Sequence, residues 1–197
     1  MNWKFPTGAT LGRWVLMAIL GWLPVRGGTL LREVFSNIPG VTLDALTNSP
    51  AYPNKPTSTN IITDFFEAPT DVAEDYGQRL RGIFTAPLSG KYTFWIAADD
   101  YAGLFLSTDA GPDKARWIAG VLGWTPPRQW DSLPEQKSAP ITLVAGARYY
   151  IEALQKEGGG GDNLAVRWVR PDGVDQGPIP LDHFVAWGLK PEAPRIS

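Results

Sequence analysis

Short segments in which apolar and polar residues alternate run through most of the chain, and residues that favour turns bound each of them. Successive side chains of a β-strand point to opposite faces, so a period of two predicts half-buried strands. In one segment, for example, Tyr92, Phe94 and Ile96 fall on one face. The segments are 30–35, 61–69, 80–87, 90–98, 102–108, 139–154 and 163–171. Helical stripes are at most a turn or two long, so we expect an all-β fold, an antiparallel sandwich or barrel of short strands joined by long loops.

Composition agrees with this fold class. A length of 197 residues fits one domain, and the 44% of apolar residues are enough to fill a core. The 21 glycines and 18 prolines interrupt helices and favour turns. Residues 47–60 are rich in Pro, Asn, Ser and Thr, which predicts a long surface loop.

Two scarcities narrow the possible chemistry. The sequence has no cysteine, and His183 is its only histidine. Cysteine nucleophiles, disulfides and thiolate metal sites are therefore excluded, while a zinc enzyme or a Ser-His-Asp triad would depend on one histidine near the C-terminal end. We expect His183 to be an ordinary surface or half-buried residue at a strand end. Any bound metal should be a hard cation with oxygen ligands.

The first 27 residues have the order of a secretory signal peptide. Lys4 and Arg13 precede a short apolar run at 14–25, and small residues follow at Gly27 and Gly28. The run is shorter than the roughly 20 residues that a membrane span needs, although an uncleaved anchor is the alternative. We therefore expect a secreted or cell-surface protein without a membrane span after cleavage.

Cleavage would leave a domain over residues 28–190, followed by a tail or truncated linker at 191–197. The mature chain would carry 15 basic and 20 acidic side chains, since the segment removed contains three basic residues and no acid. This acidic balance disfavours nucleic acid and anionic membranes as partners. It is compatible with cation binding.

Asp99 and Asp100 follow directly after the predicted strand at 90–98. Strands disfavour aspartate, and adjacent carboxylates repel one another unless a cation or hydrogen-bond donors neutralise them. The pair is thus a candidate cation site. A simple polar turn between two strands is the alternative.

A run of four glycines at 158–161 separates two predicted strands and is followed by Asp162 and Asn163. Glycines allow the backbone to turn its carbonyls toward a common point, and carboxylate, amide and backbone oxygens are the ligands of Ca²⁺. A flexible hairpin turn is the alternative. The run is not a phosphate loop, because no GK[ST] motif or helix follows it.

The segment 117–130 contains Trp117, Trp124 and Trp130 with two prolines. Tryptophans on a stiff loop would form a platform on which sugar rings stack. They would equally serve as a lid that seals one end of the sandwich.

Taken in order, these pieces resemble the PA-fourteen (PA14) domain, a lectin-like β-sandwich found in anthrax-type protective antigen, in flocculin and epithelial adhesins and as insertions in bacterial glycosidases. The resemblance is continuous over residues 79–173. It is carried by GKYTFWIAADDYAGLFLST, by AGARYYIEAL, by the glycine run and by the VRWV strand that ends in RPDG. A first strand at 30–40 and a closing strand near 179–187 would complete the fold.

The resemblance implies a ligand set. In the adhesin members of the family the paired aspartates, joined by a cis peptide, bind Ca²⁺, which in turn binds sugar hydroxyls. Carried over, Asp99 and Asp100 would be metal ligands, with Asn163 or Asp162 as a further side-chain ligand. Tyr101 stands where many members have a small residue, so it would block the site or stack on a sugar.

The leading hypothesis is therefore a secreted, Ca²⁺-dependent carbohydrate-binding domain, lectin-like and without catalysis, of the kind used in adhesion. Asp99, Asp100, Tyr101 and Trp124 would contact a glycan or polysaccharide. The alternative is a structural or protein-interaction module of a larger surface assembly that binds other surface proteins. A glycosidase would need two separated acids, and its candidates are Asp99, Asp100, Glu152 and Glu157. Adjacent aspartates cannot easily straddle a glycosidic bond, which disfavours this third hypothesis.

Overall fold

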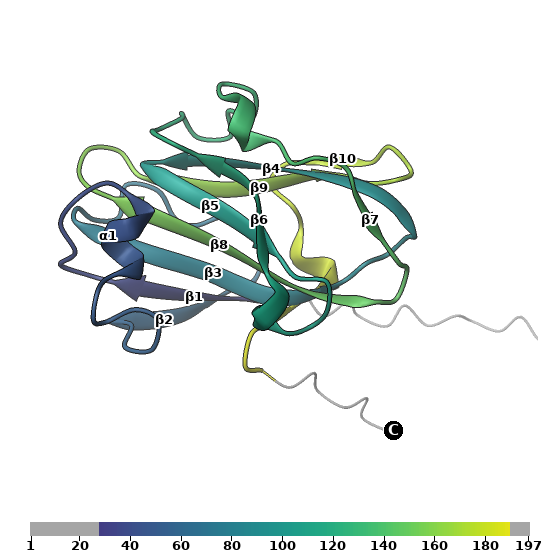
Figure 1. Ribbon diagram of the computed structural model, residues 1–197, viewed down its shortest axis with the longest axis horizontal. Coiled ribbons are helices and arrows are strands. Elements are labelled where there is room, and N and C mark those ends of the chain that lie inside the picture. The colour runs from purple at the N-terminus through teal and green to yellow at the C-terminus, as the bar shows by residue number, and fades with distance from the viewer. Residues whose placement is uncertain (1–27, 190–197) are drawn as a thin grey trace, which may run out of the picture.

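The computed structural model describes residues 28–189, in which eleven strands form two antiparallel sheets packed face to face (Figure 1). The larger sheet has the order β2-β1-β3-β8-β5-β6, and β11 also pairs with β3. Its strands are β1 (Leu30–Phe35), β2 (Ser58–Ile62), β3 (Tyr76–Thr85), β5 (Tyr101–Leu106), β6 (Arg116–Val121), β8 (Arg148–Glu157) and β11 (Phe184–Ala186). The predicted all-β sandwich is confirmed.

The smaller sheet has the order β10-β9-β4-β7. Its strands are β4 (Gly90–Asp99), β7 (Ile141–Leu143), β9 (Asn163–Val169) and β10 (Asp175–Gln176). The short helix α1 (Leu43–Thr47) packs against β8 and β5, and 3₁₀ turns occur at Pro112–Lys114, Pro134–Gln136 and Leu181–His183. Among residues 28–189, none of the helices has the length and apolar character needed to cross a bilayer.

The core lies between the two sheets and is rich in aromatic rings. The side chains of Tyr92, Phe94 and Ile96 are fully buried on the face that their alternation predicts. Phe94 pairs in register with Trp168 of β9, and the Trp168 ring contacts Phe84 of β3 at a centroid distance of 5.9 Å. Aromatic contacts of this kind add to the free energy gained from removing apolar surface from water.

Three segments differ from the sequence prediction. The strand predicted at 61–69 is a regular strand only at Ile61 and Ile62, and beyond them Phe65 and Glu67 form single bridges. Residues 58–60 belong to β2, although the stretch 47–60 was predicted to be loop. The side chains of β2 are exposed except at Ile62, so this edge strand shows no alternation and is held by backbone pairing with β1. Trp117 lies on strand β6 and not on a loop. The sequence did not predict this strand, because Gly120 interrupts the alternation of apolar and polar residues in it.

The chain ends were predicted as a signal peptide at 1–27 and a tail at 191–197, and both lie outside the described residues. The first described strand, β1, spans the predicted 30–35. The closing strand predicted near 179–187 is β11. His183 is half-buried in the turn before β11, as expected.

We predict that Trp168→Ala lowers the free energy of unfolding by about 3–5 kcal/mol, because it opens a cavity in the aromatic core. Urea denaturation measures this change. The control is Val144→Ala, which truncates an apolar side chain that is 58% exposed and should change the free energy by less than about 0.5 kcal/mol. Equal effects of the two substitutions would contradict this account of the core.

Candidate metal centre

The chain passes from the smaller sheet to the larger one at Asp99 and Asp100. Asp99 is the last residue of β4, Tyr101 is the first residue of β5, and the Asp99–Asp100 peptide bond is cis, as the resemblance implies. Both aspartates are half-buried. The crossing therefore fixes two adjacent carboxylates at one end of the sandwich.

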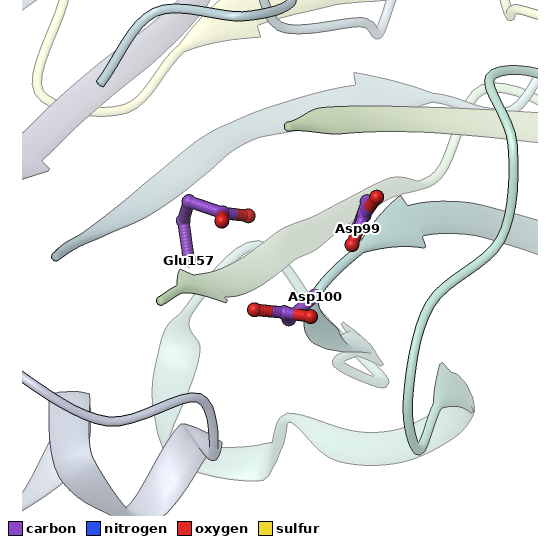
Figure 2. Close-up of side chains that lie close together, drawn as sticks. All are labelled: Asp99, Asp100 and Glu157. Carbon is purple, nitrogen blue, oxygen red and sulfur yellow. The ribbon is translucent and has the colours of Figure 1, made fainter. Parts of the chain in front are cut away.

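A third carboxylate, Glu157, joins this pair from the end of β8. One carboxylate oxygen from each of Asp99, Asp100 and Glu157 lies within 4.8 Å of the others, and Figure 2 shows the three groups around one space. Glu157 is fully buried, and neither of its carboxylate oxygens has a hydrogen-bond partner among residues 28–189. Buried oxygens of this kind normally have a partner, so the arrangement favours a bound cation.

The glycine run places its backbone against this cluster. The Gly158 N–H donates a hydrogen bond of 3.0 Å to the Asp100 carboxylate. A Cβ atom at Gly158 would lie 2.5 Å from the Val41 side chain, which explains why this position has no side chain. The Gly160 N–H, with φ of 110°, donates to the Glu74 carboxylate at 2.9 Å. The loop is thus fixed by two acidic side chains and is not a free hairpin turn.

Asn163 begins β9 and pairs in register with Asp99. Its Nδ2 donates a 2.9 Å hydrogen bond to the backbone carbonyl of Thr125, which fixes the orientation of the amide. Its Oδ1 is buried and has no hydrogen-bond partner within the described part of the chain. An oriented amide oxygen on the residue paired with Asp99 is a suitable ligand for a hard cation.

Asp162 is 3% exposed and anchors the preceding loop. Its Oδ2 accepts hydrogen bonds from the backbone N–H groups of Val72 and Ala73, at 2.7 and 3.2 Å, while Oδ1 has no partner. Of the predicted ligands, Asp99 and Asp100 thus lie together and Asn163 lies beside them. Asp162 borders the three-carboxylate group without belonging to it.

The charges in this cluster repel one another. Burial and the neighbouring Asp100 carboxylate raise the pKa of Asp99 to about 6. Burial, with Asp100 and Asp99 nearby, raises the pKa of Glu157 to about 7. The fully buried Lys156 ammonium donates to the Glu157 backbone carbonyl. Burial lowers the pKa of Lys156, although the carboxylates of Asp75, Glu157 and Asp100 oppose this shift.

A chain of buried side chains holds the backbone of Asp99. Arg32 Nε donates to Gln78 Oε1 at 2.6 Å, Gln78 donates to Gln155 Oε1, and Gln155 donates to the backbone carbonyl of Asp99. Both glutamines are fully buried. The chain fixes the end of β4 and thereby the position of its carboxylates.

The aromatic residues predicted to contact sugar flank the cluster. The backbone of Trp124 pairs with Asp99 in an isolated bridge, and its side chain is 64% exposed. Tyr101, next to Asp100, is half-buried on β5. Glu152, a candidate acid of the glycosidase hypothesis, accepts a hydrogen bond from Tyr150 and does not belong to the cluster.

Sequence reasoning did not assign Glu157 as a metal ligand. It considered this residue only as an acid for glycosidic hydrolysis. Its position directly before the glycine run was the available signal. Only the pairing of β8 with β5, in which the preceding residue Lys156 lies opposite Tyr101, brings it to the aspartates.

The protein is thus a β-sandwich with three clustered carboxylates at the point where the chain passes from one sheet to the other. The PA14 domain model matches residues 39–182, and the chain belongs to the PA14 domain family. It is 30% identical over 152 residues to the N-acetyl-beta-glucosaminyl-glycoprotein 4-beta-N-acetylgalactosaminyltransferase 1 of Mus musculus, a match that covers 75% of this chain and 14% of that protein.

Solved structures of the family share the fold at low sequence identity. The PA14 sugar-binding domain from an RTX adhesin is 15% identical with a TM-score of 0.59, over 81% of this chain and 99% of that one. The A domain of epithelial adhesin 9 from Candida glabrata, in complex with Galb1-3GlcNAc, is 11% identical with a TM-score of 0.55, over 80% of this chain and 88% of that one.

In the metal-free protein, the raised pKa values of Asp99 and Glu157 predict a specific pH dependence. The folded state binds these protons more tightly than the unfolded chain, so their contribution to stability is complete below about pH 4 and is lost as pH rises through 6 and 7. We expect Glu157→Gln to reduce the fall in Tm between pH 5 and pH 8 in chelator-treated protein.

The matched control is Glu135→Gln, because Glu135 is exposed on a 3₁₀ turn. It should leave the pH dependence of Tm unchanged. A Glu157→Gln variant with the wild-type fall in Tm would show that Glu157 does not titrate in this range.

Proposed function

We propose that this protein is a secreted or cell-surface carbohydrate-binding domain that depends on Ca²⁺ and performs no catalysis. The observation that carries the proposal is the convergence of three carboxylates at the sheet crossing, with both oxygens of the buried Glu157 unpartnered. Without a cation this arrangement is electrostatically unfavourable, and with one it is a set of oxygen ligands.

Asp99, Asp100, Glu157 and the Asn163 Oδ1 would hold the ion. Ca²⁺ takes six to eight oxygen ligands, so protein side chains alone leave part of its coordination shell free. A bound ion would offer its free coordination positions to two neighbouring sugar hydroxyls. The half-buried position of the aspartates keeps this side of the ion within reach of a ligand.

The flanking aromatic residues would orient the sugar. Trp124 exposes 64% of its surface beside Asp99, and Tyr101 follows Asp100 directly. Large aromatic rings contribute contact area at low cost in side-chain entropy. A ring held by its hydroxyls on the ion would lie against one of these two side chains.

Similar proteins support a sugar as the ligand. One structural neighbour is a sugar-binding domain from an adhesin, and another holds Galb1-3GlcNAc. The transferase relative acts on a glycoprotein by its name, and this chain corresponds to 14% of it. We infer that the domain binds glycans and that chemistry, where it occurs in such proteins, belongs to other domains.

The proposal predicts that Ca²⁺ raises Tm. At 100 times the dissociation constant, a ligand adds about 2.7 kcal/mol, which corresponds to about 5–10 °C for a domain of this size. Asp99→Asn combined with Asp100→Asn should abolish the rise, as measured by scanning calorimetry with Ca²⁺ and with chelator.

Asp113→Asn is the control for this experiment, because Asp113 is an exposed acid on the 3₁₀ turn at Pro112–Lys114. It should retain the full Ca²⁺-dependent rise. A rise that survives in the double variant would place the ion elsewhere, and no rise in the wild type would refute Ca²⁺ binding.

Glycan binding is tested with a glycan array probed in Ca²⁺ and in chelator. We expect binding that is lost in chelator and in the double aspartate variant. Binding that is equal with and without Ca²⁺ would contradict the proposed mechanism, and no binding to any glycan would favour a protein-interaction module.

A further inference from the structure

An apolar groove of about 400 Å³ lies on the outer face of the larger sheet, between the sheet and α1. Sugar-sized ligands bind in concave sites of about this volume that are mostly apolar with a few polar groups. The sheet contributes Tyr101, Phe105 and Trp117, and Leu122 follows directly after β6. The α1 segment adds the polar side chains of Thr42 and Asp44.

Trp117 forms a flat aromatic surface in this groove. Its six-membered ring lies over Gly103 and Gly120, which pair in register on β5 and β6. A Cβ atom would lie 2.4 Å from this ring at Gly103 and 1.9 Å from it at Gly120, so the ring can lie flat only because both positions are glycine. Phe105 packs its ring edge-on against Trp117 at 5.6 Å.

Much of this aromatic surface faces solvent. Trp117 is 44% exposed and the neighbouring Leu122 is 57% exposed. Large apolar side chains that are both exposed and adjacent mark binding sites more often than scattered ones do. The indole N–H, the Thr42 hydroxyl and the Asp44 carboxylate can exchange hydrogen bonds with a polar ligand.

Residues that line the groove are neighbours of residues in the candidate metal centre. Tyr101, which lines the groove, is bonded to Asp100. On the other wall Thr42 follows Val41, and the Val41 side chain lies against Gly158, close to the Asp100 carboxylate. A saccharide that is held by the cation and extends along the outer face of the larger sheet would therefore reach the groove with its next ring.

We propose that this groove is a second carbohydrate subsite, which binds the sugar ring that follows the one held by the cation. A pyranose has an apolar face of C–H groups and a rim of hydroxyls, which matches a flat indole bordered by Thr42 and Asp44. The proposal rests on the proposed function, and it makes the preferred ligand an oligosaccharide of at least two rings.

The test compares saccharides of different length. The probes are mono-, di- and trisaccharides of galactose, N-acetylglucosamine and N-acetylgalactosamine, titrated into the wild type and Trp117→Leu by calorimetry in Ca²⁺. We expect the wild type to bind a di- or trisaccharide about tenfold more tightly than its terminal monosaccharide. A tenfold gain in affinity is within what one aromatic contact and the surface it buries contribute. Trp117→Leu should lose this preference and keep its affinity for the monosaccharide and for Ca²⁺.

Two further variants exclude a folding effect. Leu122→Gln changes an exposed side chain of the groove and should lower the same preference by a smaller factor. Phe65→Leu removes an exposed aromatic ring that lines a different depression, and it should change nothing.

The outcomes separate the two proposals. The groove is not a subsite if the preference for longer saccharides persists in Trp117→Leu and Leu122→Gln. The same conclusion follows if the wild type binds monosaccharides and oligosaccharides equally well. Either result leaves the proposed cation site unaffected. No saccharide binding by the wild type in Ca²⁺ overturns the proposed function and the subsite together.

Discussion

Repulsion among three clustered carboxylates, one of them fully buried, is the constraint around which this end of the sandwich is organised. Asp99, Asp100 and Glu157 come from the ends of β4 and β8, and the distance of at most 4.8 Å between their oxygens makes full ionisation of all three costly without a counter-charge. Lys156 is near, but its ammonium is directed to a backbone carbonyl. The raised pKa values of Asp99 and Glu157 express this repulsion.

Much of the surrounding structure keeps these groups in place. Gly158 binds Asp100, the Gln78–Gln155 pair links the Asp99 carbonyl to Arg32, and Thr125 orients Asn163. These contacts come from strands of both sheets and from two loops. Such convergence of fixed polar groups is typical of a built site, since an incidental cluster of acids would relax toward solvent. The groove beside Trp117 extends the same end of the molecule along the outer sheet face.

The sequence predicted the parts of the fold that follow from alternation. Strands β4 and β9 place Phe94 and Trp168 on the core face because their apolar residues recur at every second position. It did not predict β2, whose exposed side chains carry no pattern, or the strand character of Trp117, which Gly120 interrupts. Both are edge strands of the larger sheet, where burial on one face does not dictate residue type.

The site divides in the same way. Asp99, Asp100 and Asn163 are predictable because local motifs carry them, whereas Glu157 reaches the site through long-range pairing of β8 with β5. Asp162 uses one carboxylate oxygen to fix the loop at Val72 and Ala73, and its other oxygen, buried without a partner among residues 28–189, stays a predicted ligand. Local spacing therefore indicated which polar residues gather at this end of the sandwich, and tertiary structure decided which oxygens converge.

The central claim is that a cation occupies the space between the three carboxylates. Anomalous diffraction at a long wavelength, from crystals of the protein grown in Ca²⁺, tests this claim most directly. The account predicts one anomalous peak about 2.3–2.6 Å from oxygens of Asp99, Asp100, Glu157 and Asn163. A map without a peak at this position, in which the carboxyl groups bond to one another or to water, would contradict it.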